Sequence, residues 1–224
     1  MQIHVGASLD RPPGPKYLSA LSFAELRFPS TRPKPKTLER WRASVGESFT
    51  VSIVAPKSST EDATHAFKVE ELGEGLDWLG EATRAAAARA VVIPTRRAIS
   101  TGQRDRDKLA RYFDAIRERN DALLLVWQPG GLWDLDLAIP QAEKFGVTLA
   151  VDPLEADLIP EGPLAYLRLV AMGARPRITP GMSYEVIERL REHPAEEVFV
   201  AVQSERSVRE AAGFAALLAE PEPG

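Results

Sequence analysis

ARAVVIPTR (Ala88–Arg96), DKLARYFDAIRERN (Asp107–Asn120) and ALLLVWQP (Ala122–Pro129) form the repeating unit that decides the fold of this 224-residue chain. The two outer segments are short apolar runs bounded by proline or charge, which is typical of buried strands. The middle segment places apolar residues on one helical face. These residues are Leu109, Tyr112, Phe113 and Ile116. The stretch therefore predicts a strand, a helix and a second strand.

Eight such apolar runs occur, each followed by a helical or turn-forming segment. They lie at Ile3–Ser8, Ser22–Phe28, Phe49–Lys57, Ala88–Arg96, Ala122–Pro129, Val147–Pro153, Leu164–Leu169 and Glu197–Gln203. Eight units in a chain of this length predict one closed (β/α)8 barrel of the TIM type, with its chemistry at the C-terminal strand ends. An open doubly wound sheet is the alternative, but no GxGxxG follows the first strand.

The predicted barrel is compact. The segment EADLIPEGP (Glu155–Pro163) is too short for a normal crossover helix, so we expect one or two reduced helices. No linker separates two domains, and we expect a single domain over residues 1–219 with a solvated tail at 220–224.

Composition excludes several classes of function. The net charge is −4 with acids and bases mixed along the chain, so we expect no nucleic-acid partner. The absence of cysteine excludes disulfides and thiol catalysis, and three scattered histidines do not suggest a metal site or any other cofactor. The chain starts without a signal-peptide pattern and has no apolar run of membrane-spanning length, so we expect a cytoplasmic protein with no membrane partner.

The first sixty residues carry a more specific pattern. IHVGAS (Ile3–Ser8) is followed by the block PKTLERW (Pro35–Trp41) and then by APK (Ala55–Lys57). In this order the segments resemble the DUF72 (YecE-like) proteins, and looser matches continue to VFVAVQSERSVREA near the C-terminus. The resemblance implies a TIM-barrel-like fold whose activity is unestablished.

The chain also departs from the DUF72 pattern. Polar family positions fall here on Val54, Leu125 and Val170, and the asparagine of the family's second strand falls on Arg27. The retained polar positions are Gly6, Ser8, Glu25, Asp152 and Arg168, with Gln203 and Glu205 as weaker matches. The departures indicate a diverged relative that has lost much of any family site.

Strand alternation places Glu25 and Arg168 in the barrel interior. A buried charge requires a partner, because desolvation costs several kcal/mol per ion. We therefore predict that Arg168 pairs with Glu25 or Asp152. Two interpretations remain open: a buried ion pair that fills the interior, or a guanidinium held ready to recognise a carboxylate or phosphate.

Asp152, at the end of the sixth run, is the best candidate for a general base, with Glu25 as its partner in acid–base chemistry. The alternative for Asp152 is a turn residue before Pro153. The candidate ligand-binding residues lie near the predicted strand ends. They are Arg168, Arg27, Ser8, Lys57, Trp127, Gln128 and Gln203, with Arg96 and Arg97 completing a basic rim.

Trp127 and Trp133 flank a Pro-Gly-Gly loop, where they could stack on a sugar or plug the barrel mouth. Two functions follow. The first is a protein that binds a small anionic or sugar-like ligand at the C-terminal mouth, with hydrolase- or isomerase-like acid–base chemistry if it is an enzyme. The second is an inactive barrel that serves as a structural or protein-binding module.

Overall fold

The computed structural model describes residues 1–62, 65–95, 99–171, 173 and 176–220. Eight strands are hydrogen-bonded in sequence order as a closed barrel, which confirms the predicted fold class. The strands are β1 (Gln2–Leu9), β2 (Phe23–Leu26), β3 (Thr50–Val54), β4 (Ala90–Pro94), β5 (Leu124–Gln128), β6 (Thr148–Val151), β7 (Leu164–Val170) and β8 (Glu197–Gln203).

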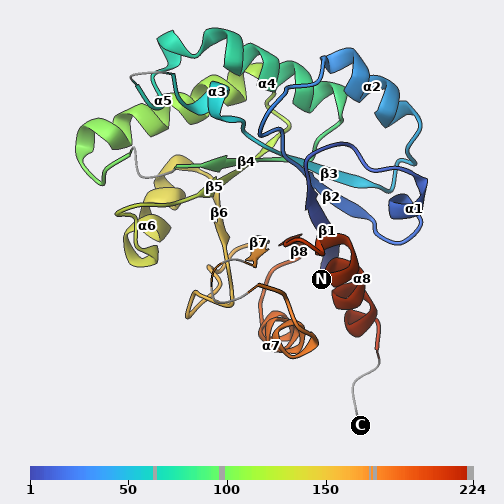
Figure 1. The fold of residues 1–224 in the computed structure, drawn as a ribbon. Coiled ribbons are helices and arrows are strands. Elements are labelled where there is room, and N and C mark those ends of the chain that lie inside the picture. The colour runs from blue at the N-terminus through green and yellow to red at the C-terminus, as the bar shows by residue number, and fades with distance from the viewer. Residues whose placement is uncertain (63–64, 96–98, 172, 174–175, 221–224) are drawn as a thin grey trace. The chain divides into compact units, whose positions relative to one another are not determined.

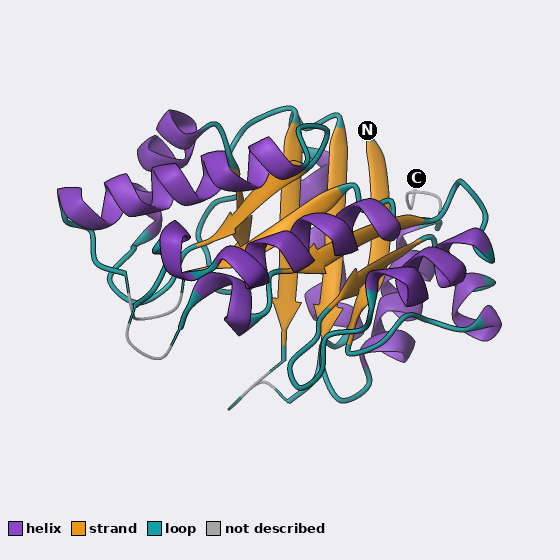
Figure 2. Ribbon diagram, turned by 90° about the horizontal axis from the view of Figure 1, so that it is seen from above, coloured by secondary structure: helices purple, strands orange, loops and turns teal. Residues whose placement is uncertain are grey.

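Along the chain, every strand except β6 is followed by a helix, and Figure 2 draws the helices in purple and the strands in orange. The helices are α1 (Pro15–Leu18), α2 (Pro35–Ala43), α3 (Lys57–Thr60), α4 (Gly73–Ala85), α5 (Gln103–Arg119), α6 (Leu135–Phe145), α7 (Pro180–Arg191) and α8 (Ser207–Leu218), with a 3₁₀ turn η1 (Val69–Glu71). Residues 152–163 contain no helix and α1 has a single turn, so the predicted reduced crossovers are confirmed. Within the described residues, no helix is both long and apolar enough to cross a bilayer.

The chain divides into two compact units. Unit 1 comprises Met1–Leu9, Pro13–Glu25 and Val151–Gly224, and unit 2 comprises Asp10–Pro12 and Leu26–Ala150. The expected single domain over residues 1–219 therefore stays a prediction. Of the expected tail at 220–224, residues 221–224 lie outside the described residues.

Unit 1 is built on three strands near the two ends of the chain. In Figure 1, β8 lies between β1 and β7, and it pairs with both in parallel. Aromatic rings fill the space beside these strands, because Phe199 stacks on Tyr166 at 5.6 Å between centroids and meets Phe23 edge-on at 5.4 Å. The ring of His4 stacks on the same Phe199 at 4.9 Å. These rings form the aromatic core of unit 1, and the Tyr166 hydroxyl also belongs to the polar network described below.

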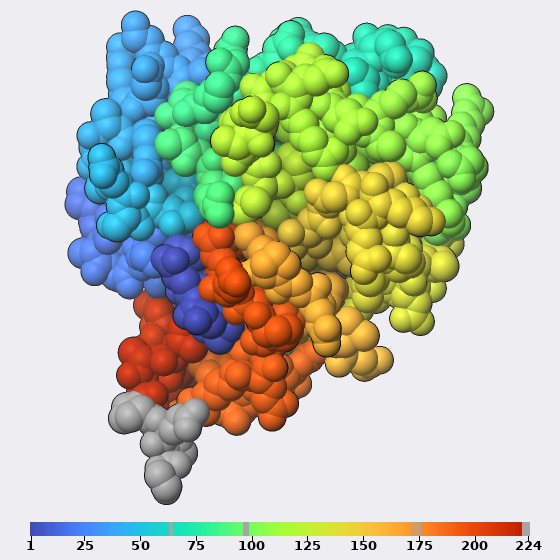
Figure 3. All heavy atoms as spheres, turned by 180° about the vertical axis from the view of Figure 1, so that it is seen from behind, coloured from blue at the N-terminus to red at the C-terminus, as the bar shows by residue number. Residues whose placement is uncertain are grey.

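Unit 2 contains the stretch from which the fold was predicted. β4 pairs in parallel with β3 and β5, and β5 pairs with β6. Figure 3 shows residues 100–150 of this unit, coloured green to yellow, as one continuous packed surface. Buried aromatic rings form a cluster in this unit, where Phe113 of α5 contacts both Trp127 of β5 and Phe145 of α6.

Gly6 allows β1 and β2 to approach closely. A Cβ at this position would lie 2.0 Å from the carbonyl oxygen of Phe23, which no side chain can accept without backbone movement. Beside it, the buried hydroxyl of Tyr17 accepts a hydrogen bond from the Ala7 amide at 2.7 Å and donates one to the Phe23 carbonyl at 2.6 Å. The local chain path in unit 1 thus requires a glycine in β1.

We expect Gly6→Ala to lower the free energy of unfolding by about 1–3 kcal/mol or more, because the added methyl group overpacks a backbone contact. Gly14→Ala is the matched control, since nothing lies within 4 Å of its Cβ position and its φ of −92° suits alanine. Urea unfolding of both variants measures the difference. Equal stability of the two variants would contradict the close approach.

Candidate functional site

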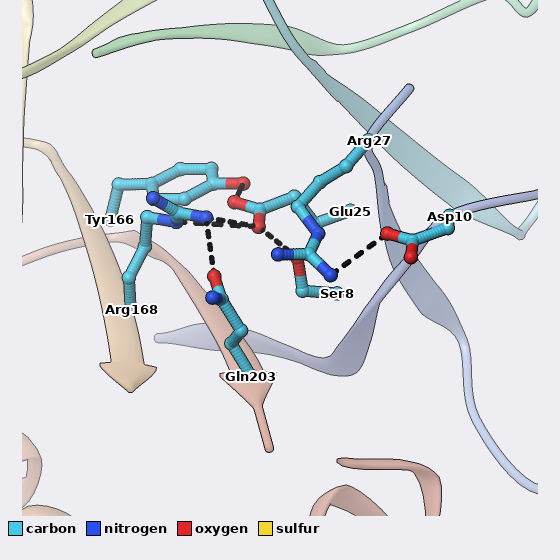
Figure 4. Close-up of polar contacts among 7 residues, drawn as sticks. All are labelled: Ser8, Asp10, Glu25, Arg27, Tyr166, Arg168 and Gln203. Carbon is cyan, nitrogen blue, oxygen red and sulfur yellow. Dashed lines mark hydrogen bonds and ion pairs between the residues drawn. The ribbon is translucent and has the colours of Figure 1, made fainter. Parts of the chain in front are cut away.

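The predicted interior residues of unit 1 meet around one carboxylate (Figure 4). Glu25 has no solvent exposure, and its Oε1 accepts hydrogen bonds from the Ser8 hydroxyl at 2.6 Å and from Arg168 Nη2 at 2.8 Å. Arg168 Nε also donates to Oε1 at 3.3 Å, and the Tyr166 hydroxyl donates to Oε2 at 3.0 Å. Arg168 Nη2 reaches Gln203 Oε1 at 3.0 Å as well. The predicted pairing of Arg168 is confirmed, with Glu25 as its partner.

Strand alternation explains this convergence. Tyr166 and Arg168 are two residues apart on β7 and therefore point to the same face. Ser8 lies near the end of β1, so β1 and β7 both bring donors to Glu25 of β2, and Gln203 at the end of β8 contacts Arg168. Tyr166 was absent from the predicted site, although its spacing from Arg168 could have indicated it.

The network supplies the charge balance that the interior needs. Burial lowers the pKa of Arg168, but the charge and hydrogen bonds of Glu25 outweigh this effect and raise the pKa above its ordinary value. Arg168 thus stays a cation, and both oxygens of Glu25 accept hydrogen bonds from the protein. The geometry matches the interpretation of an interior-filling ion pair. The catalytic role expected for Glu25 and the ligand-binding roles expected for Ser8, Arg168 and Gln203 stay predictions.

Asp152 lies just after β6 and is half-buried. Its Oδ1 accepts a hydrogen bond from the Leu154 amide at 3.0 Å and its Oδ2 one from the Val170 amide at 3.1 Å. Its carbonyl accepts from the amides of Glu155 and Ala156. Asp152 therefore organises the turn after β6 and ties it to the end of β7, while its expected role as a general base stays a prediction.

The structure corrects the interpretation of Trp127. Its side chain is fully buried, and its ring contacts Phe113 of α5 and Phe145 of α6, so it faces the helices. Its Nε1 donates to Thr95 Oγ1 at 2.9 Å, and its ring meets Trp133 edge-on at 4.9 Å between centroids. The expectation that Trp127 covers a ligand is therefore wrong, as is the expectation that it plugs the barrel mouth.

The remaining predicted residues lie in unit 2. Arg27 Nη2 pairs with Asp10 Oδ1 at 2.8 Å, as Figure 4 also shows, and Gln128 is half-buried at the end of β5. Lys57 is exposed at the start of α3, with its Nζ 3.7 Å from Glu61 Oε2. The expected rim residues Arg96 and Arg97 lie outside the described residues.

Lys57 lines a cavity of about 480 Å³ formed by the segments that directly follow β2 and β3. A volume of this size is typical of small-molecule sites. The charged residues in its wall are two cations, Arg32 and Lys57, and two acids, Glu61 and Asp62. Phe28, Pro29, Ser30, Pro56 and Ser58 complete the lining.

Arg32 was not predicted as a site residue, and the structure fixes its position. Its guanidinium lies over the ring of Trp78, 5.6 Å from the centroid, and its Nη2 contacts Glu74 Oε1 at 3.4 Å. Trp78 is itself held by a hydrogen bond from its Nε1 to the Pro33 carbonyl at 2.9 Å. Arg32 Nη1 is buried and has no hydrogen-bond partner among the described residues.

The described part of the chain contains no group of three or more His, Asp or Glu side chains placed to hold a metal ion. In unit 2, the acids of the cavity wall already have partners of their own. Asp62 Oδ1 accepts from the His65 amide at 2.6 Å, and Glu61 faces Lys57.

Solved structures share the fold across the whole chain. A DUF72 family protein from Enterococcus faecalis V583 aligns with a TM-score of 0.73 and 16% identity, covering 98% of each chain. A second crystal structure of that DUF72 protein gives a TM-score of 0.68 and 14% identity over 99% of this chain and 97% of the other. A xylose isomerase domain containing protein from Salmonella typhimurium LT2 aligns at 0.61 and 13% identity, over 89% of this chain and 88% of the other.

The barrel fold implied by the resemblance to DUF72 is thereby confirmed. No family model matches the sequence, and no curated protein matches it. At these identities the likeness concerns the fold, and the chemistry has to be argued from this chain's own residues.

We expect Arg168→Met to lower the free energy of unfolding by about 3–5 kcal/mol, because it leaves the Glu25 charge buried without its cation. The double variant Glu25→Leu/Arg168→Met removes both charges and should recover much of that loss. Denaturant unfolding of the single and double variants measures the coupling. Arg209→Met, on the exposed surface of α8, is the control. A single variant as stable as the control would contradict the structural role of the ion pair.

Proposed function

We propose that this protein is a divergent barrel of the DUF72 type that binds a small hydroxylated anion, such as a sugar acid or a sugar phosphate. The site is the cavity formed by the segments after β2 and β3 in unit 2. The observation that carries the proposal is the pair of cations in its wall, Lys57 and the Arg32 guanidinium that lies over the Trp78 ring.

Charge supports an anionic ligand. Arg32 is held by Trp78 and by the proline-rich chain around it, so little side-chain freedom is lost on binding. Lys57 supplies a second cation on a flexible stem, in the same wall. Together the two can neutralise a carboxylate or phosphate group.

The acidic residues of the cavity favour a ligand that also carries hydroxyl groups. Glu61 and Asp62 line the same cavity as Arg32 and Lys57 and carry the opposite charge. Their carboxylate oxygens can accept hydrogen bonds from hydroxyl groups. A bare anion would be repelled by these acids, whereas a hydroxylated anion uses both kinds of group. Ser30 and Ser58 add hydroxyls that both donate and accept.

The proposal concerns binding and includes no catalytic step. Glu25 and Asp152 each accept hydrogen bonds from two or more protein donors, so neither carboxylate is in a geometry that favours it as an acid or base. An inactive barrel that serves as a structural or partner-binding module is the second candidate. It is favoured by the interior ion pair, which fills the core of unit 1. The cytoplasmic location expected from the sequence stays a prediction.

A thermal-shift screen tests the binding proposal with gluconate, glucuronate, glucose 6-phosphate, inorganic phosphate and glucose. At about 100 times its dissociation constant, a ligand stabilises the folded state by about 2.7 kcal/mol, which raises the Tm of a chain of this size by about 5–10 °C. We expect one of the hydroxylated anions to give this shift, and neutral glucose to give a smaller one.

The variants Arg32→Met and Lys57→Met locate the site. Each should weaken binding by about tenfold to a hundredfold, because a hydrogen bond to a charged group contributes about 1.5–3 kcal/mol. Arg40→Met, an exposed position of α2, is the matched control and should bind as the wild type does. If no compound shifts the Tm, or if the two variants bind unchanged, the small-ligand proposal fails and the structural module is favoured.

A further inference from the structure

A second cavity of unit 2 lies between the chain segment before α4 and the first half of α5. Its volume is about 310 Å³, at the lower end of the range for small-ligand sites. The wall consists of His65, Phe67, Lys68, Val69, Glu70, Arg104, Lys108 and Arg111. Four cations and one carboxylate thus surround a small space in a protein whose net charge is −4.

The helical spacing explains why the cations converge. Arg104, Lys108 and Arg111 are separated by four and three residues, so they lie on one face of α5. Lys68 immediately precedes η1, which packs against α5. Figure 1 shows α5 as a long helix of this unit, next to α4. The result is a basic wall on two sides of the cavity.

Two of the four cations already have partners. Lys68 Nζ pairs with Glu71 Oε1 at 2.7 Å, and this hydrogen bond raises the pKa of Lys68. Lys108 Nζ pairs with Asp105 Oδ1 at 2.8 Å. Partial burial raises the pKa of Asp105, but the hydrogen bonds from Lys108 and Ser100 outweigh it and lower that pKa to about 2. Both lysines therefore already have an acid beside them.

The two arginines have no such partner. Arg104 and Arg111 are exposed, and across the ranges that the structure describes neither side chain makes a hydrogen bond or an ion pair. They lie seven positions apart on α5, about 10.5 Å along the helix axis. Their long side chains can therefore reach one anion from two ends.

The chain next to the cavity is held in a strained conformation. Phe67 has a φ of 57°, which is rare for a bulky residue and costs about 1–3 kcal/mol. The surrounding contacts maintain it: the amide of Phe67 donates to the Thr60 carbonyl at 2.8 Å, and its buried ring meets Tyr112 of α5 edge-on at 4.9 Å. Strain of this kind concentrates at ligand sites. Here it fixes the position of Lys68 relative to α5.

We propose that this cavity binds a compact phosphorylated metabolite that carries a diphosphate or two phosphate groups. Its four cations match an anion of several charges, and planar guanidinium groups bind phosphate oxygens in pairs. The small volume favours a free metabolite over a polymer. This site is separate from the one proposed for the hydroxylated anion, since the two cavities have no lining residue in common.

Isothermal titration calorimetry with inorganic pyrophosphate, and with orthophosphate for comparison, tests this site at low ionic strength. We expect pyrophosphate to bind more tightly than orthophosphate. The double variant Arg104→Gln/Arg111→Gln should weaken pyrophosphate binding by about a hundredfold, because it removes two charge-assisted contacts. Glu70→Gln removes the one carboxylate of the wall and should strengthen binding.

Arg40→Gln is the matched control, since it deletes the same charge from α2, outside the cavity, and should leave binding unchanged. The arginines of α5 are at the surface, so the variants should keep the stability of the wild type, which circular dichroism can check. Undetectable pyrophosphate binding by the wild type, or equal binding by the double variant and the wild type, would overturn the inference. Binding of a single-stranded oligonucleotide without binding of pyrophosphate would do the same, because it would identify a polymer site.

Discussion

The requirement that a buried charge be matched governs the interior of unit 1. Glu25 has no contact with solvent, and a carboxylate in that position is stable only where donors surround it. Ser8, Tyr166 and Arg168 supply those donors, and each must sit at the correct height on its own strand. The positions of β1, β2 and β7 in this unit are therefore coupled through one side chain. An apolar residue at position 25 would not require these strands to adopt one relative position. This favours the interpretation that the ion pair specifies how the strands of unit 1 pack.

This part of the structure could be predicted from the sequence because strand periodicity is regular. Residues two apart on a strand share a face, so Arg168 could be placed in the interior and its need for an acidic partner followed from desolvation. The βα repeat predicted the barrel for a similar reason: most of the apolar runs end at or just before a proline or a charged residue, and eight such units in a chain of this length favour closure over an open sheet. The choice between Glu25 and Asp152 as the partner depended on distances between strands, which periodicity does not contain.

The sequence was misleading where both faces of a strand are apolar. Trp127 was assigned to the mouth because it precedes a turn, but β5 is covered by helices on one side and by the interior on the other, and either face accepts an aromatic ring. The contact with Phe113 and Phe145 decided the direction. Arg32 was missed for a different reason. It lies in a proline-rich segment without periodicity, and only its stacking on Trp78, 46 residues away in the sequence, makes it a fixed donor.

The chain between β3 and α4 contributes lining residues to both proposed sites of unit 2. Asp62 lines the larger cavity and His65 the smaller one, and the two residues are joined by a hydrogen bond from the His65 amide and by an ion-pair contact of 3.7 Å between Nδ1 and Oδ2. A ligand hydroxyl that binds Asp62 competes for the same carboxylate that positions His65. Because coupling between two binding sites is reciprocal, any change in affinity that a ligand at Asp62 causes at the smaller cavity is matched by the same change in the opposite direction of binding. The strained Phe67, two residues beyond His65, packs its ring against Tyr112 and so ties this segment to α5.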